Sequence, residues 1–262
     1  MAKIIFFQPH PDDLELNCAY LLNYLSLKSN KNHDIRIASI TKGEFGLPGF
    51  EYDRYKGDYL AQVRVKELEK AAAIHGIPAN KIDWFGYIDG FVEFNKVFIE
   101  HIIQYLQEHR PDIIIAPEAL YTWYYHKDHV NTGRAIYYVI SNSLLGYIPK
   151  LYFYSTLSPN YYFPIDQSSI SLTERLIKCH KTQVWLLKSM KRMNKPIWII
   201  SGFHTPGFKY AEPYRLVYFE KELKKKNRPN WLIQGLVRII ASHAQLFDAQ
   251  YPEEILKELE KA

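Results

Sequence analysis

The sequence of 262 residues has few cysteines and no long apolar run. Cys18 and Cys179 are its only cysteines, too few for a disulfide framework or a site built from several thiolates, and such chains suit a reducing compartment. No stretch reaches the roughly 20 apolar residues that a membrane-spanning helix needs. No apolar signal core precedes Lys3. We therefore expect a cytoplasmic protein that does not reside in a membrane.

A strong excess of charge is also missing. The chain carries 33 Lys and Arg against 28 Asp and Glu, a net charge of +5, and much of the excess lies within residues 221–228. So local an excess argues against nucleic acid as a partner. Hydrophobic residues make up 47% of the chain, which is typical of a globular protein with an ample core. At this length we expect one domain over residues 1–262.

Apolar strand-like runs alternate with helical spacing along most of the chain. Strands are predicted at residues 4–7, 34–41, 82–85, 112–116 and 150–154. This alternation predicts an α/β fold, a Rossmann-like, mostly parallel sheet with helices on both faces. Beyond it we expect an irregular loop at 158–169, a long helix over about 172–193, strands at 197–200 and 215–219, and a helical C-terminal extension, 220–262, packed on the domain.

A glycine-rich loop, Lys42 to Gly49, follows the second predicted strand. Its spacing is not that of the dinucleotide-binding pattern GxGxxG, and Pro48 lies where a helix would have to open. We therefore interpret it as a connecting loop without a bound nucleotide.

The first motif with potential metal ligands is Gln8-Pro9-His10-Pro11-Asp12-Asp13. It follows the first strand and precedes a helical pattern, so it occupies a strand-to-helix turn, where open α/β sheets bind ligands. An imidazole and two carboxylates so close together are suited to a metal site if a further ligand exists elsewhere. The simpler interpretation is that Asp12 or Asp13 caps the helix and that His10 is an ordinary loop residue.

A second motif, His126-Lys127-Asp128-His129, follows the predicted strand at 112–116 and opens another helix. Here too, Asp128 could be a helix cap beside two incidental histidines. Because both motifs follow strands of one parallel sheet, we expect them at the same sheet edge, which favours a shared metal site. The spacing does not decide which of the two histidines is the ligand.

Together these motifs resemble those of the zinc-dependent deacetylases of the LmbE/PIG-L family. The resemblance covers roughly residues 3–214. It is carried by His10 to Asp13 with Glu15, Thr41 to Glu44 with Arg64 and Glu67, Tyr87 to Gly90, His126 to His129, and Tyr210 to Glu212. Members of the family remove the acetyl group from N-acetylglucosamine units of sugar conjugates, with one zinc ion on a Rossmann-like fold.

The resemblance implies a role for each matched residue. His10, Asp13 and His129 would bind Zn²⁺, and three N/O ligands with an open fourth position are typical of catalytic zinc. Asp12 would be the general base, with a protonated His126 beside the developing oxyanion and Asp128 as its orienting partner. We expect substrate contacts from the following residues: Arg64, Glu44, Asp89, Tyr125 and Glu212.

Several positions depart from the family pattern. Lys127 stands where proline is common, and Lys42 replaces a frequent arginine. Residues 17–20 occupy a stretch that is usually glycine-rich, and Tyr20 places a bulky ring where close helix packing is expected. We therefore expect a different helix position and pocket shape there. No proposed ligand is lost.

We expect a hydrolase that deacetylates a small amino sugar containing N-acetylglucosamine, on which some of Trp84, Tyr87, Trp123, Tyr124 and Tyr125 would stack. One alternative is an amidase that acts on a larger sugar-thiol or N-acetylglucosaminyl-lipid conjugate. The basic run Lys224 to Lys226 and the apolar stripe of residues 231–240 would favour the lipid version. The same stripe makes a homo-oligomer a fair expectation. Another alternative is a sugar-binding protein without turnover, against which the intact motifs argue.

Overall fold

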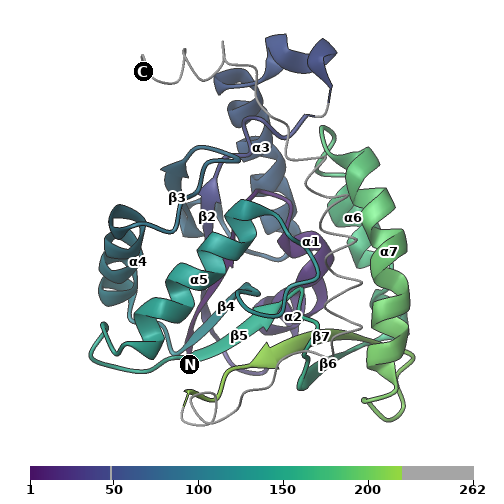
Figure 1. The fold of residues 1–262 in the computed structure, drawn as a ribbon. Coiled ribbons are helices and arrows are strands. Elements are labelled where there is room, and N and C mark those ends of the chain that lie inside the picture. The colour runs from purple at the N-terminus through teal and green to yellow at the C-terminus, as the bar shows by residue number, and fades with distance from the viewer. Residues whose placement is uncertain (48, 220–262) are drawn as a thin grey trace.

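The computed structural model describes residues 1–47 and 49–219. Its centre is a seven-stranded sheet in the order β3-β2-β1-β4-β5-β7-β6 (Figure 1). The strands are β1 (Lys3–Gln8), β2 (Asp34–Thr41), β3 (Ile82–Tyr87), β4 (Ile113–Pro117), β5 (Lys150–Tyr154), β6 (Tyr161–Ile165) and β7 (Tyr210–Leu216). The first five are parallel, whereas β7 runs antiparallel to both β5 and β6. The predicted mostly parallel sheet is confirmed.

Helices cover both faces of the sheet (Figure 1). They are α1 (Leu14–Asn17), α2 (Ala19–Asn23), α3 (Asp58–Ile74), α4 (Lys96–His109), α5 (Lys127–Ser141), α6 (Leu172–Ile177) and α7 (Val184–Gly202). Short helical turns lie at Tyr24–Lys28, Phe50–Tyr55, Ala79–Lys81 and Gln167–Ser169.

The alternating side chains of β1 explain this layering. Ile5 and Phe7 pack into one buried cluster with residues of α4 and α5, whereas Ile4 and Phe6 pack into another with residues of α1, α2 and α3. Successive strand residues point to opposite faces, and a strand that is apolar at every position is therefore buried on both. A third cluster joins Tyr20 to α6 and α7, which form an outer layer over α2.

The late part of the chain differs from the sequence prediction. The loop expected at 158–169 contains β6, which pairs with β7 along its length. The long helix expected at 172–193 is two helices separated by residues 178–183, and residues 197–200, expected as a strand, lie within α7. A short run such as Ile197–Ile200 is compatible with either a strand or a buried helix segment, and here the apolar face of α7 prevails.

The departure at residues 17–20 coincides with a break in the first helix. Cys18 leaves the helical conformation, with φ −139° and ψ 8°, and separates α1 from α2. The Tyr20 hydroxyl accepts a hydrogen bond from Thr173 and donates one to the carbonyl of Ile170, while its ring packs edge-on against Trp198. The outer layer of α6 and α7 therefore accommodates this bulky ring.

The expected C-terminal extension, with its basic run and apolar stripe, lies outside the described residues. Among the helices of the described part, none has both the length and the apolar character to span a membrane.

A buried ion pair connects the parallel and antiparallel parts of the sheet. Glu118, just after β4, receives hydrogen bonds of 2.7 Å from Nε and from Nη2 of Arg215 in β7. Glu118 is fully buried and Arg215 is 3% exposed. Removing one partner of such a pair leaves a buried charge without compensation, which is far more costly than losing an exposed pair.

We expect Arg215→Met to lower the free energy of unfolding by about 3–5 kcal/mol, because Glu118 would remain buried without its partner. The matched control is Lys191→Met, which breaks the more exposed pair of Lys191 with Glu174 and should cost much less stability. Chemical denaturation of both variants measures the difference. Equal losses in the two variants would contradict this account.

Candidate metal centre

The candidate site lies at the carboxyl ends of the parallel strands. Between β1 and β4 the strand order reverses, and such a switch point opens a crevice where α/β proteins bind ligands. His10, Asp12 and Asp13 follow β1, whereas Asp128 and His129 open α5 after β4. The two motifs separated by more than a hundred residues thus meet, as the sequence predicted.

A glycine brings the start of α5 close to the sheet. Gly133 lies one turn after His129, and a Cβ atom built there would be 2.4 Å from the carbonyl oxygen of Pro117 at the end of β4. A larger residue would push the helix away, so the close approach requires glycine. This contact places Asp128 and His129 at the end of β4.

His10 lies among three carboxylates. Its Nε2 atom is 3.0 Å from Asp89 Oδ1 and 3.2 Å from Asp128 Oδ2, and its Nδ1 atom is 3.6 Å from Asp13 Oδ2. Burial alone lowers the pKa of His10, but these carboxylates outweigh burial and raise it well above 6.5. The pocket around His10 therefore favours a positive charge.

Asp13 links the two predicted histidine ligands. Its Oδ2 atom accepts a hydrogen bond of 2.8 Å from the backbone N–H of His10, and its Oδ1 atom lies 3.1 Å from His129 Nε2. Burial acts to raise the pKa of Asp13, but His129 and His10 outweigh it, so the pKa is held well below its usual range. Asp13 is therefore a carboxylate available to a cation.

The donor set fits a divalent metal ion. Ligand atoms of His10, Asp13 and His129 lie within 4.8 Å of one another, and so do those of His10, His126 and Asp128. Both ring nitrogens of His129 are buried without a hydrogen-bond partner, although Nε2 lies beside Asp13. An unpartnered imidazole nitrogen beside a carboxylate is the arrangement that two ligands of one ion would take.

The charge of the pocket leads to the same conclusion. Four carboxylates, Asp12, Asp13, Asp89 and Asp128, are at most 9% exposed. Arg64 offsets one of these charges. Because unpaired buried charges are costly, a divalent cation held by His10, Asp13 and His129 would offset two more.

His126 is oriented by the backbone of the helix that it caps. Its Nδ1 atom accepts a hydrogen bond of 3.3 Å from the N–H of Asp128. The Asp128 carboxylate points elsewhere: it accepts hydrogen bonds from the N–H groups of Gly90 and Val92 and contacts His10. Burial, and next the charge of His10, lower the pKa of His126 to about 4, so at neutral pH its imidazole is uncharged. With Nδ1 accepting, the proton of the neutral ring lies on Nε2.

Arg64 of α3 holds Asp12. Its Nη2 atom is 3.0 Å from Asp12 Oδ1, and its Nη1 atom donates a hydrogen bond of 2.9 Å to the carbonyl of Gly43. A Cβ atom at Gly43 or Gly46 would lie 2.2 or 2.1 Å from Nη1, so the guanidinium packs directly on the loop backbone. This contact gives the part of the glycine-rich loop from Gly43 to Gly46 a physical role.

Two of the expected substrate-binding residues join the cluster. Asp89, after β3, contacts His10 and accepts a hydrogen bond from the N–H of Phe45, while Glu44 accepts one from the N–H of Asp89. The second carboxylate oxygen of Glu44 is buried without a hydrogen-bond partner. Burial, and next the charge of Asp89, raise the pKa of Glu44.

The other two residues expected to bind substrate, Tyr125 and Glu212, have no hydrogen bond to the cluster among the contacts described above. Tyr125 is 46% exposed. Glu212 is fully buried and accepts hydrogen bonds from the N–H groups of Tyr20 and Leu21 and from the hydroxyl of Tyr214. These bonds fix the start of α2 to β7. Their substrate contacts stay predictions.

Tyr124 is a site residue that the sequence indicated only as one of several aromatic candidates. Its ring stacks on His126 and lies edge-on to His129, with centroid distances of 6.2 and 4.7 Å. Its position two residues before the second motif was the available signal.

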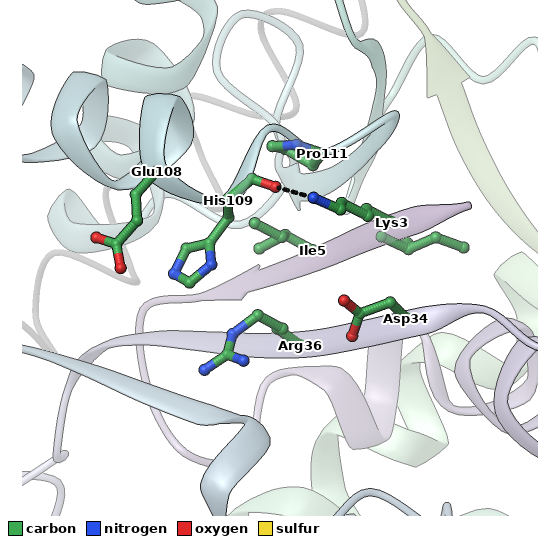
Figure 2. Close-up of a pocket in the computed structure, with 8 residues that line it drawn as sticks. Lys3, Ile5, Asp34, Arg36, Glu108, His109 and Pro111 are labelled. Carbon is green, nitrogen blue, oxygen red and sulfur yellow. Dashed lines mark hydrogen bonds between the residues drawn. The ribbon is translucent and has the colours of Figure 1, made fainter. Parts of the chain in front are cut away.

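A pocket at the other end of the strands does not contain the metal-binding motifs (Figure 2). It lies at the amino ends of β1 and β2, and its lining includes Lys3, Arg36 and His109. Arg36 is already paired with Asp83, and Lys3 donates a hydrogen bond to the His109 carbonyl. We therefore place the functional site at the opposite, carboxyl ends of the strands.

One family model matches just over half of the chain. The family model described as "PIG-L: GlcNAc-PI de-N-acetylase" matches residues 5–140, which include both motifs. A curated relative, the diacetylchitobiose deacetylase of Thermococcus kodakarensis, is 25% identical over 236 residues, which cover 83% of this chain and 84% of the relative.

Solved structures share the fold. The N,N'-diacetylchitobiose deacetylase from Pyrococcus horikoshii, solved with an inhibitor, superposes with a TM-score of 0.73 at 22% identity, covering 84% of this chain and 85% of that one. The 4-carboxy-2-hydroxymuconate hydratase GalB from Pseudomonas putida superposes with a TM-score of 0.65 at 14% identity, covering 88% and 99%. The fold therefore occurs with different reactions, and the side chains of the site must carry the functional argument.

The buried Glu212 predicts a pH dependence of stability. Burial raises its pKa to about 7 from an ordinary 4.5, and the three donors offset this only in part. Between pH 4.5 and about pH 7, Glu212 holds a proton in the folded state that it has released in the unfolded state. The stabilisation from this proton is therefore complete below pH 4.5 and is lost as pH rises through 7, a loss of roughly 2–4 kcal/mol.

We expect Glu212→Gln, which cannot ionise, to gain stability relative to the unaltered protein as pH rises from 4.5 to 7. Denaturant unfolding at several pH values measures this difference. The exposed Glu51→Gln serves as the control. A constant difference for Glu212→Gln would refute the raised pKa.

Proposed function

The chain belongs to the PIG-L family, and on that premise we propose that it is a zinc-dependent hydrolase that removes the acetyl group from an N-acetylglucosamine-containing sugar. The observation that carries this proposal is the buried set of His10, Asp13 and His129 directly beside Asp12, at the sheet's switch point. This set combines three N/O ligands with a separate carboxylate that is free to accept a proton.

Zinc bound by His10, Asp13 and His129 would polarise the acetamide carbonyl and lower the pKa of the attacking water. The ligand set leaves Asp12 outside the metal shell. The adjacent carboxylates thus divide two tasks, because Asp13 is turned towards the histidines whereas Asp12 is held by Arg64.

Asp12 acts as the general base. It accepts the proton of the attacking water and later returns it to the leaving amine, so that acetate and a free amine are formed. Arg64 fixes its carboxylate through the 3.0 Å contact. Positioning of this kind is necessary because a base must lie within hydrogen-bond reach of the proton that it takes.

His126 stabilises the oxyanion as a neutral donor. The sequence-based expectation was a protonated His126, but the lowered pKa and the accepting Nδ1 atom favour an uncharged ring with its proton on Nε2. That N–H donates a hydrogen bond to the developing oxyanion. The return of the proton to the amine then falls to Asp12.

The proposed substrate is a small amino sugar of the diacetylchitobiose type. The curated relative named for that substrate matches over most of both chains, which supports this choice. The family description names N-acetylglucosaminyl-phosphatidylinositol, so the glycolipid is the second candidate. The test therefore includes both compounds.

A metal-binding experiment separates the two candidate ligand groups. We expect His129→Asn to lower the zinc affinity by more than the roughly 10–100-fold typical of losing an outer-shell partner, because it removes a direct ligand. His126→Asn is the matched comparison and should retain the ion. Competition titration with a zinc chelator measures both affinities. The reverse order would assign the metal to His10, His126 and Asp128 instead.

An activity experiment tests the reaction itself. Zinc-loaded protein should release acetate from N-acetylglucosamine, diacetylchitobiose or the glycolipid, and Asp12→Asn should reduce kcat by roughly 10²–10⁴-fold with unchanged zinc content, because the base is lost. Asp58→Asn, at the exposed start of α3, is the control. Stoichiometric zinc without acetate from any of these substrates would refute the proposed reaction.

A further inference from the structure

Residues 178–183, which we call the α6–α7 connector, carry three polar side chains that bind the scaffold of the site. His180 is fully buried and Gln183 is 3% exposed, although both lie in a segment between helices. Neither contacts the predicted ligands. The partners of the three connector side chains belong to α1, which follows Asp12 and Asp13, to α3, which carries Arg64, and to the glycine-rich loop.

His180 binds the helix that follows the first motif. Its Nε2 atom lies 2.9 Å from Glu15 Oε1, and Glu15 is 2% exposed. Glu15 is two residues beyond Asp13 and lies in α1. This contact fixes the connector to the helix that directly follows Asp12 and Asp13.

Thr182 binds the helix that carries Arg64. Its N–H donates a hydrogen bond of 2.9 Å to Glu67 Oε1, and its hydroxyl donates one of 2.6 Å to Glu67 Oε2. Glu67 lies three residues after Arg64, on the neighbouring turn of α3. The carboxylate is therefore held at both oxygens.

Gln183 binds the glycine-rich loop. Its Nε2 atom donates a hydrogen bond of 2.9 Å to the carbonyl of Gly46. The Gly46 N–H in turn donates to the carbonyl of Gly43, which also accepts from Arg64. The Arg64 guanidinium packs on both glycines, so the position of this loop determines where the guanidinium can lie.

We infer that Gln183 is a positioning residue for the reaction: it holds the glycine-rich loop against Arg64 and thereby keeps the guanidinium on Asp12. The inference rests on the function proposed above. His180 and Thr182 support the same arrangement, because they fix the connector to α1 and α3, the other elements that meet at Asp12 and Arg64. A side chain outside the family's motifs thus controls the orientation of the general base.

Gln183→Glu is the sharpest variant. It preserves the length of the side chain but replaces the donating NH₂ group with an oxygen that faces the Gly46 carbonyl. The loop should then lose its anchor, whereas the contacts of His180 and Thr182 remain. Gln104→Glu, on the exposed side of α4, is the matched control.

Amide hydrogen exchange tests the link between the connector and the loop without reference to activity. Gln183→Glu should speed exchange in peptides that cover residues 43–47 by about tenfold or more and leave α4 unchanged. Gln104→Glu should leave the loop unchanged. An unaltered exchange rate in the loop of Gln183→Glu would overturn the inference, whatever the reaction catalysed.

A double-mutant cycle tests the catalytic consequence. We expect Gln183→Glu to lower kcat by up to roughly 100-fold at unchanged zinc stoichiometry, because a displacement of about 1 Å in a positioned group can cost that much. In an Arg64→Lys background it should cost at most about threefold, because no guanidinium remains to be positioned. Equal costs in both backgrounds would show a general structural role and refute the inference.

The two experiments distinguish this inference from the proposed function. Absence of acetate release by the unaltered, zinc-loaded protein would refute the function, and the exchange measurement would still decide whether Gln183 anchors the loop.

Discussion

Four carboxylates buried at one sheet edge are the constraint on which the site depends. Asp12, Asp13, Asp89 and Asp128 arrive from three different strand ends, and their partners are Arg64, the histidines and backbone N–H groups. So much buried negative charge is stable only where cations and donors are arranged around it. Against the effect of burial, the surrounding carboxylates raise the pKa of His10, which reflects this demand.

The positions of these partners explain why the fold is arranged as it is. Gly133 brings α5 against β4, and two glycines of the loop after β2 admit the Arg64 guanidinium. The connector between α6 and α7 then fixes the loop from outside. Close packing by glycine and buried hydrogen bonds from distant segments therefore serve one purpose, which is to hold charged side chains where water cannot compensate them.

Sequence patterns predicted the first half of the fold well because β1 and β4 are apolar at nearly every position, as in Ile4 to Phe7, and β2 alternates apolar and polar residues at its start. They failed for β6, whose residues are mostly half-buried, and for Ile197 to Ile200, which fit either a strand or a helix. The meeting of the two motifs was predictable from the parallel topology alone. The contact of Asp89 with His10 and the role of Gln183 were not, because they depend on side-chain directions in loops that have no periodicity.

The comparison with GalB limits what the architecture can imply. A hydratase shares the fold, so neither the sheet nor its switch point selects deacetylation. The functional argument for this chain therefore rests on the arrangement of its own side chains: Asp13 is turned towards two histidines, Asp12 is held by Arg64, and His126 accepts a hydrogen bond at Nδ1. Amide hydrolysis needs a base, an oxyanion donor and a proton for the amine. If His126 is neutral in the working enzyme, a single carboxylate must supply both proton steps. The orientation of Asp12, and hence the loop that fixes Arg64, then becomes the feature on which the rate depends most.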